Sequence, residues 1–176
     1  GKPWSVIFWW RYKLISNSRF KFNVGAHPAL IFKTISIVEN GVQKNILEAQ
    51  RFFAAEFSPN YLLTKNISIG LYYLYGHGFE PDATQNTHFL TLNSNISNIK
   101  LSKKISMRIT PQFYYLKMDN SDGVYFTGSL GLADLRYPFS ISGVFNKAIK
   151  TNISGSQNFV WNTTLSYSFF HNYVKR

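Results

Sequence analysis

The stretch Phe20-Lys21-Phe22-Asn23-Val24-Gly25-Ala26-His27 alternates strictly between apolar residues and small or polar residues. Successive side chains of an extended strand point to opposite faces, so this segment has one apolar face and one polar face. The same period of two recurs at residues 105–110 and 161–169, among others. No helical period of 3.6 persists over a useful length. The sequence therefore predicts an all-β chain.

Turn signals divide the alternating segments into nine predicted strands. Asn40-Gly41 marks a turn within a longer connection over residues 34–45. Pro28 lies on an apolar face, where we expect a bulge or a lost ladder hydrogen bond. Arg51 interrupts the apolar face of its strand, which places it near an aqueous end. The predicted strands cover residues 4–14, 20–33, 46–61, 67–80, 87–99, 105–118, 124–134, 139–149 and 159–169.

The composition favours a membrane environment built from strands. Of the 176 residues, which suit a single domain over 1–176, 18% are aromatic, yet the mean hydropathy is only −0.14. The longest apolar runs, such as Val6–Trp10 and Leu71–Tyr75, are far shorter than the roughly 20 residues of a spanning helix. A transmembrane barrel spreads its apolar surface in this way, with every second residue facing lipid. We therefore predict an antiparallel up-and-down transmembrane β-barrel of about eight to ten strands.

Alternation assigns a face to each strand residue. We expect a lipid-facing aromatic and aliphatic belt and a narrow lumen whose charged groups pair with one another. A soluble barrel of the lipocalin kind would place the same apolar face inside, and alternation alone is compatible with both. The aromatic, charge-poor face and the long strands favour lipid outside. The predicted belt is Phe8, Trp10, Phe22, Phe53, Phe57, Leu71, Tyr73, Phe113, Phe126, Phe145, Trp161, Tyr167 and Phe169. The predicted lumen network is Arg11, Lys21, His27, Lys33, Glu48, Glu56 and Arg108.

Connection lengths predict the orientation. Short turns near 15–19, 63–66, 100–104 and 135–138 alternate with mostly longer connections, as short periplasmic turns alternate with longer outer loops. The C-terminus is then periplasmic, and the first strand begins outside. An up-and-down barrel with both ends inside needs an even number of strands, whereas nine are counted. We therefore expect N-terminal strands to be missing, so that residues 1–176 form the C-terminal part of a larger barrel.

The last strand resembles the C-terminal assembly signal of bacterial outer-membrane proteins, with apolar residues at alternate positions before a final aromatic. Trp161, Leu165, Tyr167 and Phe169 fit this pattern, whereas the tail from Phe170 to Arg176 departs from it. The Asn-, Lys- and Tyr-rich texture resembles porin-like barrels of the Bacteroidota. The resemblance implies a Gram-negative outer membrane, contact with membrane lipids and lipopolysaccharide, and other outer-membrane proteins as partners.

Candidate chemistry is sparse. His77 and His88 lie near Glu80 and Asp82, but the His-x-Ser motif of outer-membrane acyl hydrolases is missing and Ser94 is six residues beyond His88. An enzyme is therefore the disfavoured alternative. Four scattered histidines give no metal-ligand spacing, no cofactor motif occurs, and the lack of cysteine excludes a disulfide framework.

The net charge of +11 raises the question of nucleic acid. Single-strand binders interleave basic and aromatic residues on one face, whereas here the two kinds occupy opposite faces of the same strands. No nucleic-acid partner is expected. We predict a structural or accessory subunit of an outer-membrane assembly. A small pore lined by cationic groups and a lipid-modifying enzyme are the alternatives.

Overall fold

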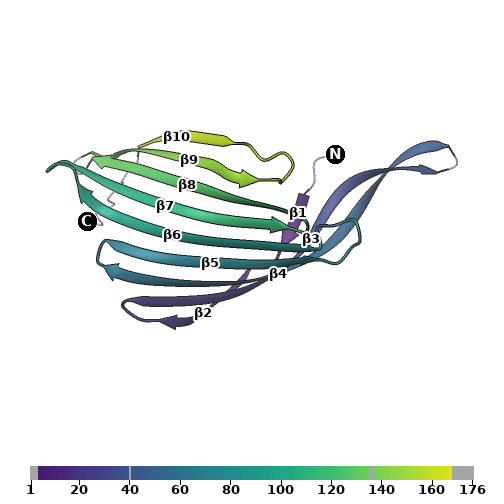
Figure 1. Cartoon of the computed structure of the whole chain (residues 1–176), viewed down its shortest axis with the longest axis horizontal. Coiled ribbons are helices and arrows are strands. Elements are labelled where there is room, and N and C mark those ends of the chain that lie inside the picture. Colours follow the sequence, from purple (N-terminus) through teal and green to yellow (C-terminus); the bar gives the residue numbers. More distant parts are fainter. Residues whose placement is uncertain (1–3, 40, 135–136, 168–176) are drawn as a thin grey trace, which may run out of the picture.

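The computed structural model describes residues 4–39, 41–134 and 137–167 as one antiparallel sheet. Each strand pairs with the next along the chain, which confirms the all-β, up-and-down prediction (Figure 1). The strands are β1 (Trp4–Ile7), β2 (Trp10–Ser16), β3 (Phe20–Glu39), β4 (Val42–Thr64), β5 (Ile67–Gly78), β6 (Asn86–Lys100), β7 (Ile105–Met118), β8 (Ser121–Asp134), β9 (Phe139–Thr151) and β10 (Phe159–Tyr167).

Strands β1 and β2 are two halves of one interrupted strand. Both pair with β3 in the same register, since Ile7 stands opposite Ala29 and Trp10 opposite Ala26. The interruption lies opposite Pro28. The Phe8 N–H donates to the Pro28 carbonyl, but proline has no N–H with which to return the bond. Register runs through Pro28 without a bulge, so the second of the two expected effects, a lost ladder bond, occurs.

The β3–β4 hairpin is longer than the sequence indicates. Residues 34–45 were predicted as a connection, and this prediction is wrong, because the two strands pair continuously as far as Glu39 opposite Val42. Only the tip is a turn, and Gly41 adopts a φ of 75° there, which favours glycine. The hairpin projects beyond the neighbouring strands in Figure 1.

The other connections form two sets at opposite ends of the sheet. At one end, called the short-turn end, the connections fall at 17–19, 65–66, 101–104 and 135–138. At the other, called the loop end, lie the hairpin tip, the two-residue turn at 119–120, and the longer loops 79–85 and 152–158. Alternation of short and long connections is therefore retained in part.

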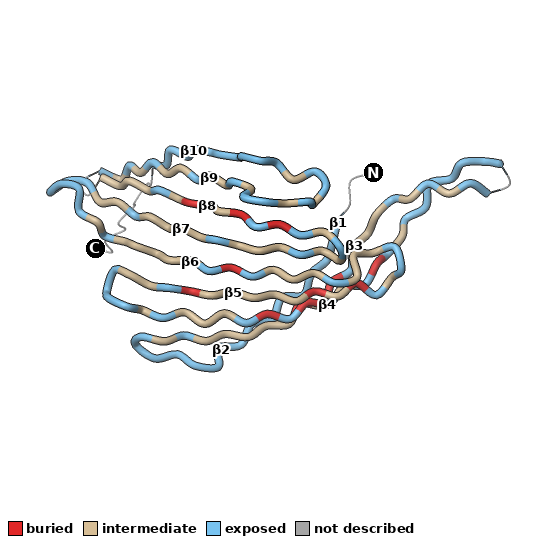
Figure 2. Tube along the Cα trace, in the orientation of Figure 1, coloured by how far each residue is buried: buried red, intermediate tan, exposed pale blue. Residues whose placement is uncertain are grey.

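Burial is strongly asymmetric between the two faces. The buried side chains, described residues less than a tenth exposed, are Ala29, Ala54, Tyr125, His27, Gln50, Glu56 and Thr91. The pairing register places all seven on one face, because opposed residues share a face. Side chains on the inside of a curved sheet shield one another, so the sheet curves toward this face. The most buried stretches lie in the middle of the strands (Figure 2).

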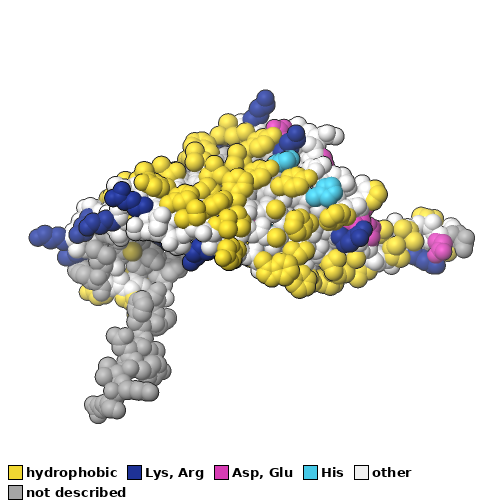
Figure 3. Space-filling model, turned by 90° about the horizontal axis from the view of Figure 1, so that it is seen from below, with side chains coloured by type: hydrophobic (Ala, Val, Ile, Leu, Met, Phe, Trp, Pro, Cys, Tyr) yellow, Lys and Arg dark blue, Asp and Glu magenta, His cyan; other side chains and the backbone are white. Residues whose placement is uncertain are grey.

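The opposite, convex face carries the large exposed apolar side chains. Trp10 is 62% exposed and Trp161 67% exposed, and both lie on this face by register. Neighbouring rings pack along it, with 4.8 Å between the ring centroids of Phe113 and Phe126. Figure 3 shows hydrophobic side chains spread across the molecule, with basic side chains mostly at the margins.

The sheet has two free edges. Within residues 4–39, 41–134 and 137–167, β1 and β2 pair only with β3, and β10 pairs only with β9. Closure into a barrel therefore stays a prediction. In the same part of the chain, no helix is both long and apolar enough to cross a membrane.

Candidate functional site on the concave face

The seven residues of the predicted lumen network all lie on the concave face. Arg11 is opposite Gly25, and Gly25 is opposite Glu56, so β2, β3 and β4 bring a cation and an anion together. His27, Lys21 and Lys33 follow from alternation along β3, and Lys33 stands opposite Glu48. Arg108 lies on the same face of β7, opposite Gly131. The structure divides these residues into a central cluster, a loop-end cluster and two isolated cations.

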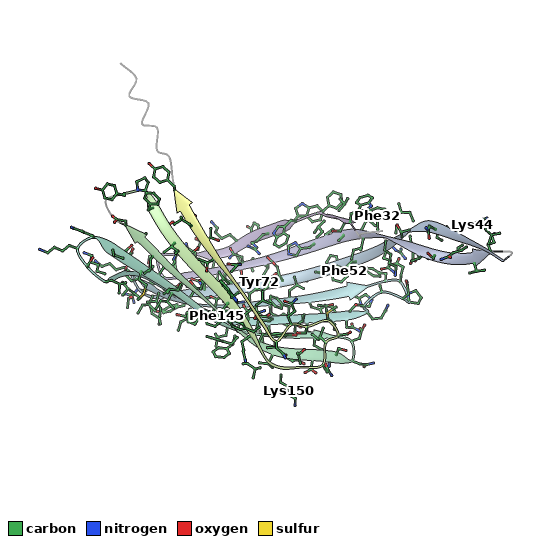
Figure 4. All side chains as sticks on the ribbon, turned by 90° about the horizontal axis from the view of Figure 1, so that it is seen from above. Phe32, Lys44, Phe52, Tyr72, Phe145 and Lys150 are labelled. Atoms are coloured by element: carbon green, nitrogen blue, oxygen red, sulfur yellow. The ribbon has the colours of Figure 1, made fainter. Side chains whose placement is uncertain are left out.

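The central cluster is built around Glu56. Its side chain is 1% exposed and its carboxylate accepts a hydrogen bond from Arg11 Nε at 2.5 Å. The Tyr72 hydroxyl donates to the second carboxylate oxygen, also at 2.5 Å. A buried carboxylate is costly unless paired and hydrogen-bonded, and this one has both kinds of partner. Tyr72 lies in the middle of the sheet in Figure 4.

His27 completes the central cluster. Its Nε2 lies 3.1 Å from the second oxygen of Glu56, close enough for an ion pair but not aligned as a hydrogen bond. Its Nδ1 is buried without a hydrogen-bond partner in the described structure. The ring packs against Trp9 with 4.1 Å between centroids, and the Arg11 guanidinium lies 5.4 Å from the Trp9 ring centre. Trp9 thus covers the cluster on its β2 side.

Gly25 makes the cluster possible. A Cβ atom at this position would lie 2.8 Å from Glu56 Cγ and 2.7 Å from the backbone oxygen of Trp10. Real Cβ atoms do not approach other atoms so closely, and the backbone oxygen has no room to move. A glycine here lets Glu56 lie flat across β3 to reach Arg11 on the far side.

A polar hollow of about 390 Å³ opens beside Arg11 and Tyr72. Amide side chains dominate its lining, and they come from four different strands: Asn23, Asn60, Asn93 and Gln112. Asn23 donates to Ser58 Oγ at 3.3 Å. Polar walls of this kind favour water or a polar solute over an apolar ligand.

The loop-end cluster joins the β5–β6 loop to the β3–β4 hairpin. Lys33 donates to Asp82, and Gln50 donates to the same Asp82 oxygen at 2.8 Å and to Glu48 at 3.2 Å. Arg51, on the convex face, donates from its side chain and its backbone N–H to Glu80, at 2.8 and 2.7 Å. These bonds fold residues 79–85 back over the end of the sheet, beyond the last paired residue of β5.

Both loop carboxylates are held in the ionised form. The Lys33 ammonium, through its hydrogen bond, holds the pKa of Asp82 below the ordinary 3.8, and Arg51 does the same for Glu80 relative to 4.5. A lowered folded pKa adds stability that is present above the unfolded pKa and lost as pH falls through the folded pKa. The loop contacts are therefore complete at neutral pH and weaken in acid below pH 3.8.

We expect acid to release the β5–β6 loop. A spin label attached at Thr84→Cys should show unchanged mobility from pH 7 to pH 5 and increased mobility below about pH 4, because protonated Asp82 and Glu80 lose their cationic partners. In Asp82→Asn the label should be more mobile already at pH 7. Equal mobility at pH 3 and pH 7 in the unmodified loop would contradict the assigned role of these carboxylates.

Lys21 and Arg108 are the isolated cations. Lys21 stands opposite Asn60 near the short-turn end. Arg108 borders a second hollow of about 470 Å³ together with Asn98 and Ser106. Neither has an ion-pair partner among residues 4–39, 41–134 and 137–167. The structure therefore brings five of the seven predicted lumen residues into polar clusters and leaves two apart.

The predicted belt residues lie on the convex face. Phe57 and Tyr73 stand opposite each other, with 5.3 Å between ring centroids, and Phe145 stands opposite Trp161. Register places Trp10, Phe22, Phe53, Leu71, Phe113, Phe126 and Tyr167 on the same face. Phe8 stands between β1 and β2, opposite Pro28 of that face. Phe169 lies outside the described residues.

The histidines of the enzyme alternative also lie on the convex face. His77 stands opposite Phe53, and His88 shares a 2.8 Å hydrogen bond with the Tyr73 hydroxyl. Ser94 is six residues along the same extended strand, which is about 20 Å from His88. The Ser94 hydroxyl donates to the Ser68 carbonyl instead. The structure does not bring Ser94 and His88 together.

Sequence reasoning missed several members of the clusters. Tyr72 belongs to an apolar run, but its even position beside Gly70 and Gly76 places it on the polar face, so alternation could have found it. Trp9 alternates with Arg11 in the same way. The partners of Asp82 could not be found, because loop residues follow no period. Within the part of the chain that the structure describes, no three His, Asp or Glu residues are grouped to hold a metal ion. No protein-family model matches the chain, and no curated protein or solved structure is significantly similar to it.

Proposed function

We propose that this chain is an integral β-sheet protein of a bacterial outer membrane that acts as a structural or accessory subunit. One observation carries the proposal: a curved sheet buries polar side chains on its concave face and exposes aromatic side chains across its whole convex face. Continuous apolar surfaces of this extent mark contact with a membrane or a protein. The spans β5 to β9 contain 12 to 15 residues, enough to cross a hydrocarbon core when tilted.

The direction of curvature argues against a soluble ligand-binding barrel. A lipocalin-like protein would bury its apolar face and present its polar face to water. Here Glu56 and Thr91 are each 4% exposed, whereas Leu92, next to Thr91 but on the other face, is 53% exposed. Lipid supplies the apolar surroundings that the convex face lacks within the sheet. The lumen side supplies partners for the charges.

The same face favours a structural role over an open pore. Glu56 and its partners occupy the middle of the concave face, and the β5–β6 loop covers part of the loop end through Asp82. Charges that satisfy one another leave fewer free groups to attract permeating ions. Basic side chains at the short-turn end, such as Arg19, Lys65 and Lys103, suit contact with lipid phosphates.

Membrane extraction tests the proposal. We expect the protein to remain in the membrane pellet after a carbonate wash at high pH, because its apolar face is solvated by lipid rather than held by surface charge. Release into the supernatant, in amounts matching a peripheral control protein, would contradict membrane integration.

Electrical recording separates the two membrane roles. In planar bilayers, the purified protein should add no stepwise conductance above the baseline, because Glu56 and its partners fill the middle of the concave face. Reproducible single-channel steps with ion selectivity would favour the pore alternative and overturn the structural role. A porin reconstituted in parallel serves as the positive control.

A further inference from the structure

The two free edges of the sheet show that its concave side is incomplete there. Trp9 and Ile7 face the concave side next to one edge and are 58% and 53% exposed. On β10, at the other edge, Val160 faces the same side and is 43% exposed. In the interior strands the equivalent side chains of His27 and Glu56 are almost fully buried. The edges therefore lack the neighbours that the interior strands have.

Both edge strands run in the same direction. β1 and β2 start at the loop end and finish at the short-turn end at Ser16. β10 also starts at the loop end, after the loop 152–158, and finishes at the short-turn end. This follows from the strand count, since the interrupted β1/β2 and β3 to β10 make nine antiparallel rows among the described residues. A sheet with an odd number of antiparallel rows has parallel edges.

A second copy does not complete such a sheet. Copies inserted in the same orientation present only edges that point the same way, so any seam between them is parallel. An antiparallel seam between copies would need one copy upside down, with its short turns on the wrong side of the membrane. Unpaired backbone groups are costly in hydrocarbon, so the edges need a partner if the sheet spans the membrane. The inference rests on the proposed function in this one respect.

We propose that an odd number of further antiparallel strands, belonging to the same polypeptide but lying outside residues 4–167, joins β1/β2 to β10. Each inserted strand next to an edge runs from the short-turn end to the loop end, which makes both seams antiparallel and the total even. Sequential order supports a covalently joined segment. Every strand in this sheet has its chain neighbour as its spatial neighbour, so the next row is expected to be the next segment in sequence. Its inward residues are small or polar, and its outward residues are apolar.

Cysteine pairs test whether β2 and β10 are direct neighbours. The natural chain has no cysteine, so pairs can be introduced cleanly. Lys13→Cys combined in turn with Asn162→Cys, Thr164→Cys or Ser166→Cys should give no disulfide in cell membranes. One inserted strand separates the edges by about 10 Å, beyond the reach of a disulfide. Ser142→Cys with Thr164→Cys, which stand directly opposite, should crosslink and provides the matched control. A Lys13–β10 disulfide would overturn the proposal by showing a directly closed parallel seam.

A photo-crosslinker identifies the occupant. With p-benzoylphenylalanine in place of Thr163, irradiation of cells expressing the full-length protein should yield a product of unchanged mass. Its crosslinked peptide should come from outside residues 4–167. A product of twice the mass, or one joined to a different polypeptide, would overturn the proposal. The carbonate wash of the same membranes reports separately on membrane integration, so an error there is distinguished from an error in strand closure.

Discussion

Leu92→Arg is expected to destabilise the membrane-embedded protein by about 2–4 kcal/mol, the cost of an arginine near the bilayer midplane of a β-barrel. Leu92 lies near the middle of β6 on the convex face, between Leu71 and Phe113. It is already 53% exposed within the sheet, so the change breaks little protein packing. The expected loss therefore reports on lipid contact. Denaturant-induced unfolding from lipid vesicles measures it.

Asn93→Arg is the matched control for Leu92→Arg. The residue is the next along β6, and it borders the polar hollow beside Gly70 and Gln112. The same charge placed there remains in water, and a loss of less than about 1 kcal/mol is expected. If the two variants lose equal stability, or if Asn93→Arg loses more, the assignment of lipid to the convex face is wrong.

Glu56→Ala is expected to cost about 2–4 kcal/mol of stability. The substitution removes the acceptor of both Arg11 and Tyr72 and leaves His27 buried without a counter-charge. Breaking a buried ion pair costs about 3–5 kcal/mol, and the expected loss is lower because Arg11 remains 42% exposed and can be solvated. The same vesicle unfolding assay measures the loss.

Two variants interpret that result. Glu39→Ala breaks an ion pair with Lys44 in which both side chains are more than half exposed, and less than about 1 kcal/mol should be lost. Glu56→Gln keeps a hydrogen-bond acceptor for Tyr72 but removes the charge, so an intermediate loss is expected. A loss for Glu56→Ala no greater than that for Glu39→Ala would show that Glu56 does not organise the concave face.

The sequence predicts the faces of the strands well because alternation is a local property. Once Phe22 and Val24 lie on one face, Asn23 and Gly25 must lie on the other, whatever the neighbouring strands do. Pairing without slips keeps these faces aligned from β3 to β10 apart from four local register shifts, such as the one at Ser97 and Asn98. The polar and apolar sets therefore remain separate over the whole sheet.

The contacts between strands were not predictable in the same way. That Glu56 meets Arg11 across β3 depends on register and on the missing side chain of Gly25, neither of which periodicity reveals. The long β3–β4 hairpin was missed because residues 34–45 carry turn-forming and charged residues that also suit an exposed ladder. The Asp82 contacts depend on a loop that folds back on the hairpin. Closure of the sheet depends on residues beyond those described.

The most direct test of the central claim, that the convex face contacts lipid, is a nitroxide scan along β6 in lipid vesicles. Single labels at positions 89 to 94 are compared for collision with oxygen, which concentrates in lipid, and with a water-soluble nickel chelate. We predict a period of two, with high oxygen and low nickel accessibility at Leu90 and Leu92 and the reverse at Thr91 and Asn93. Uniform nickel accessibility along the strand, or a pattern of the opposite phase, would contradict the claim.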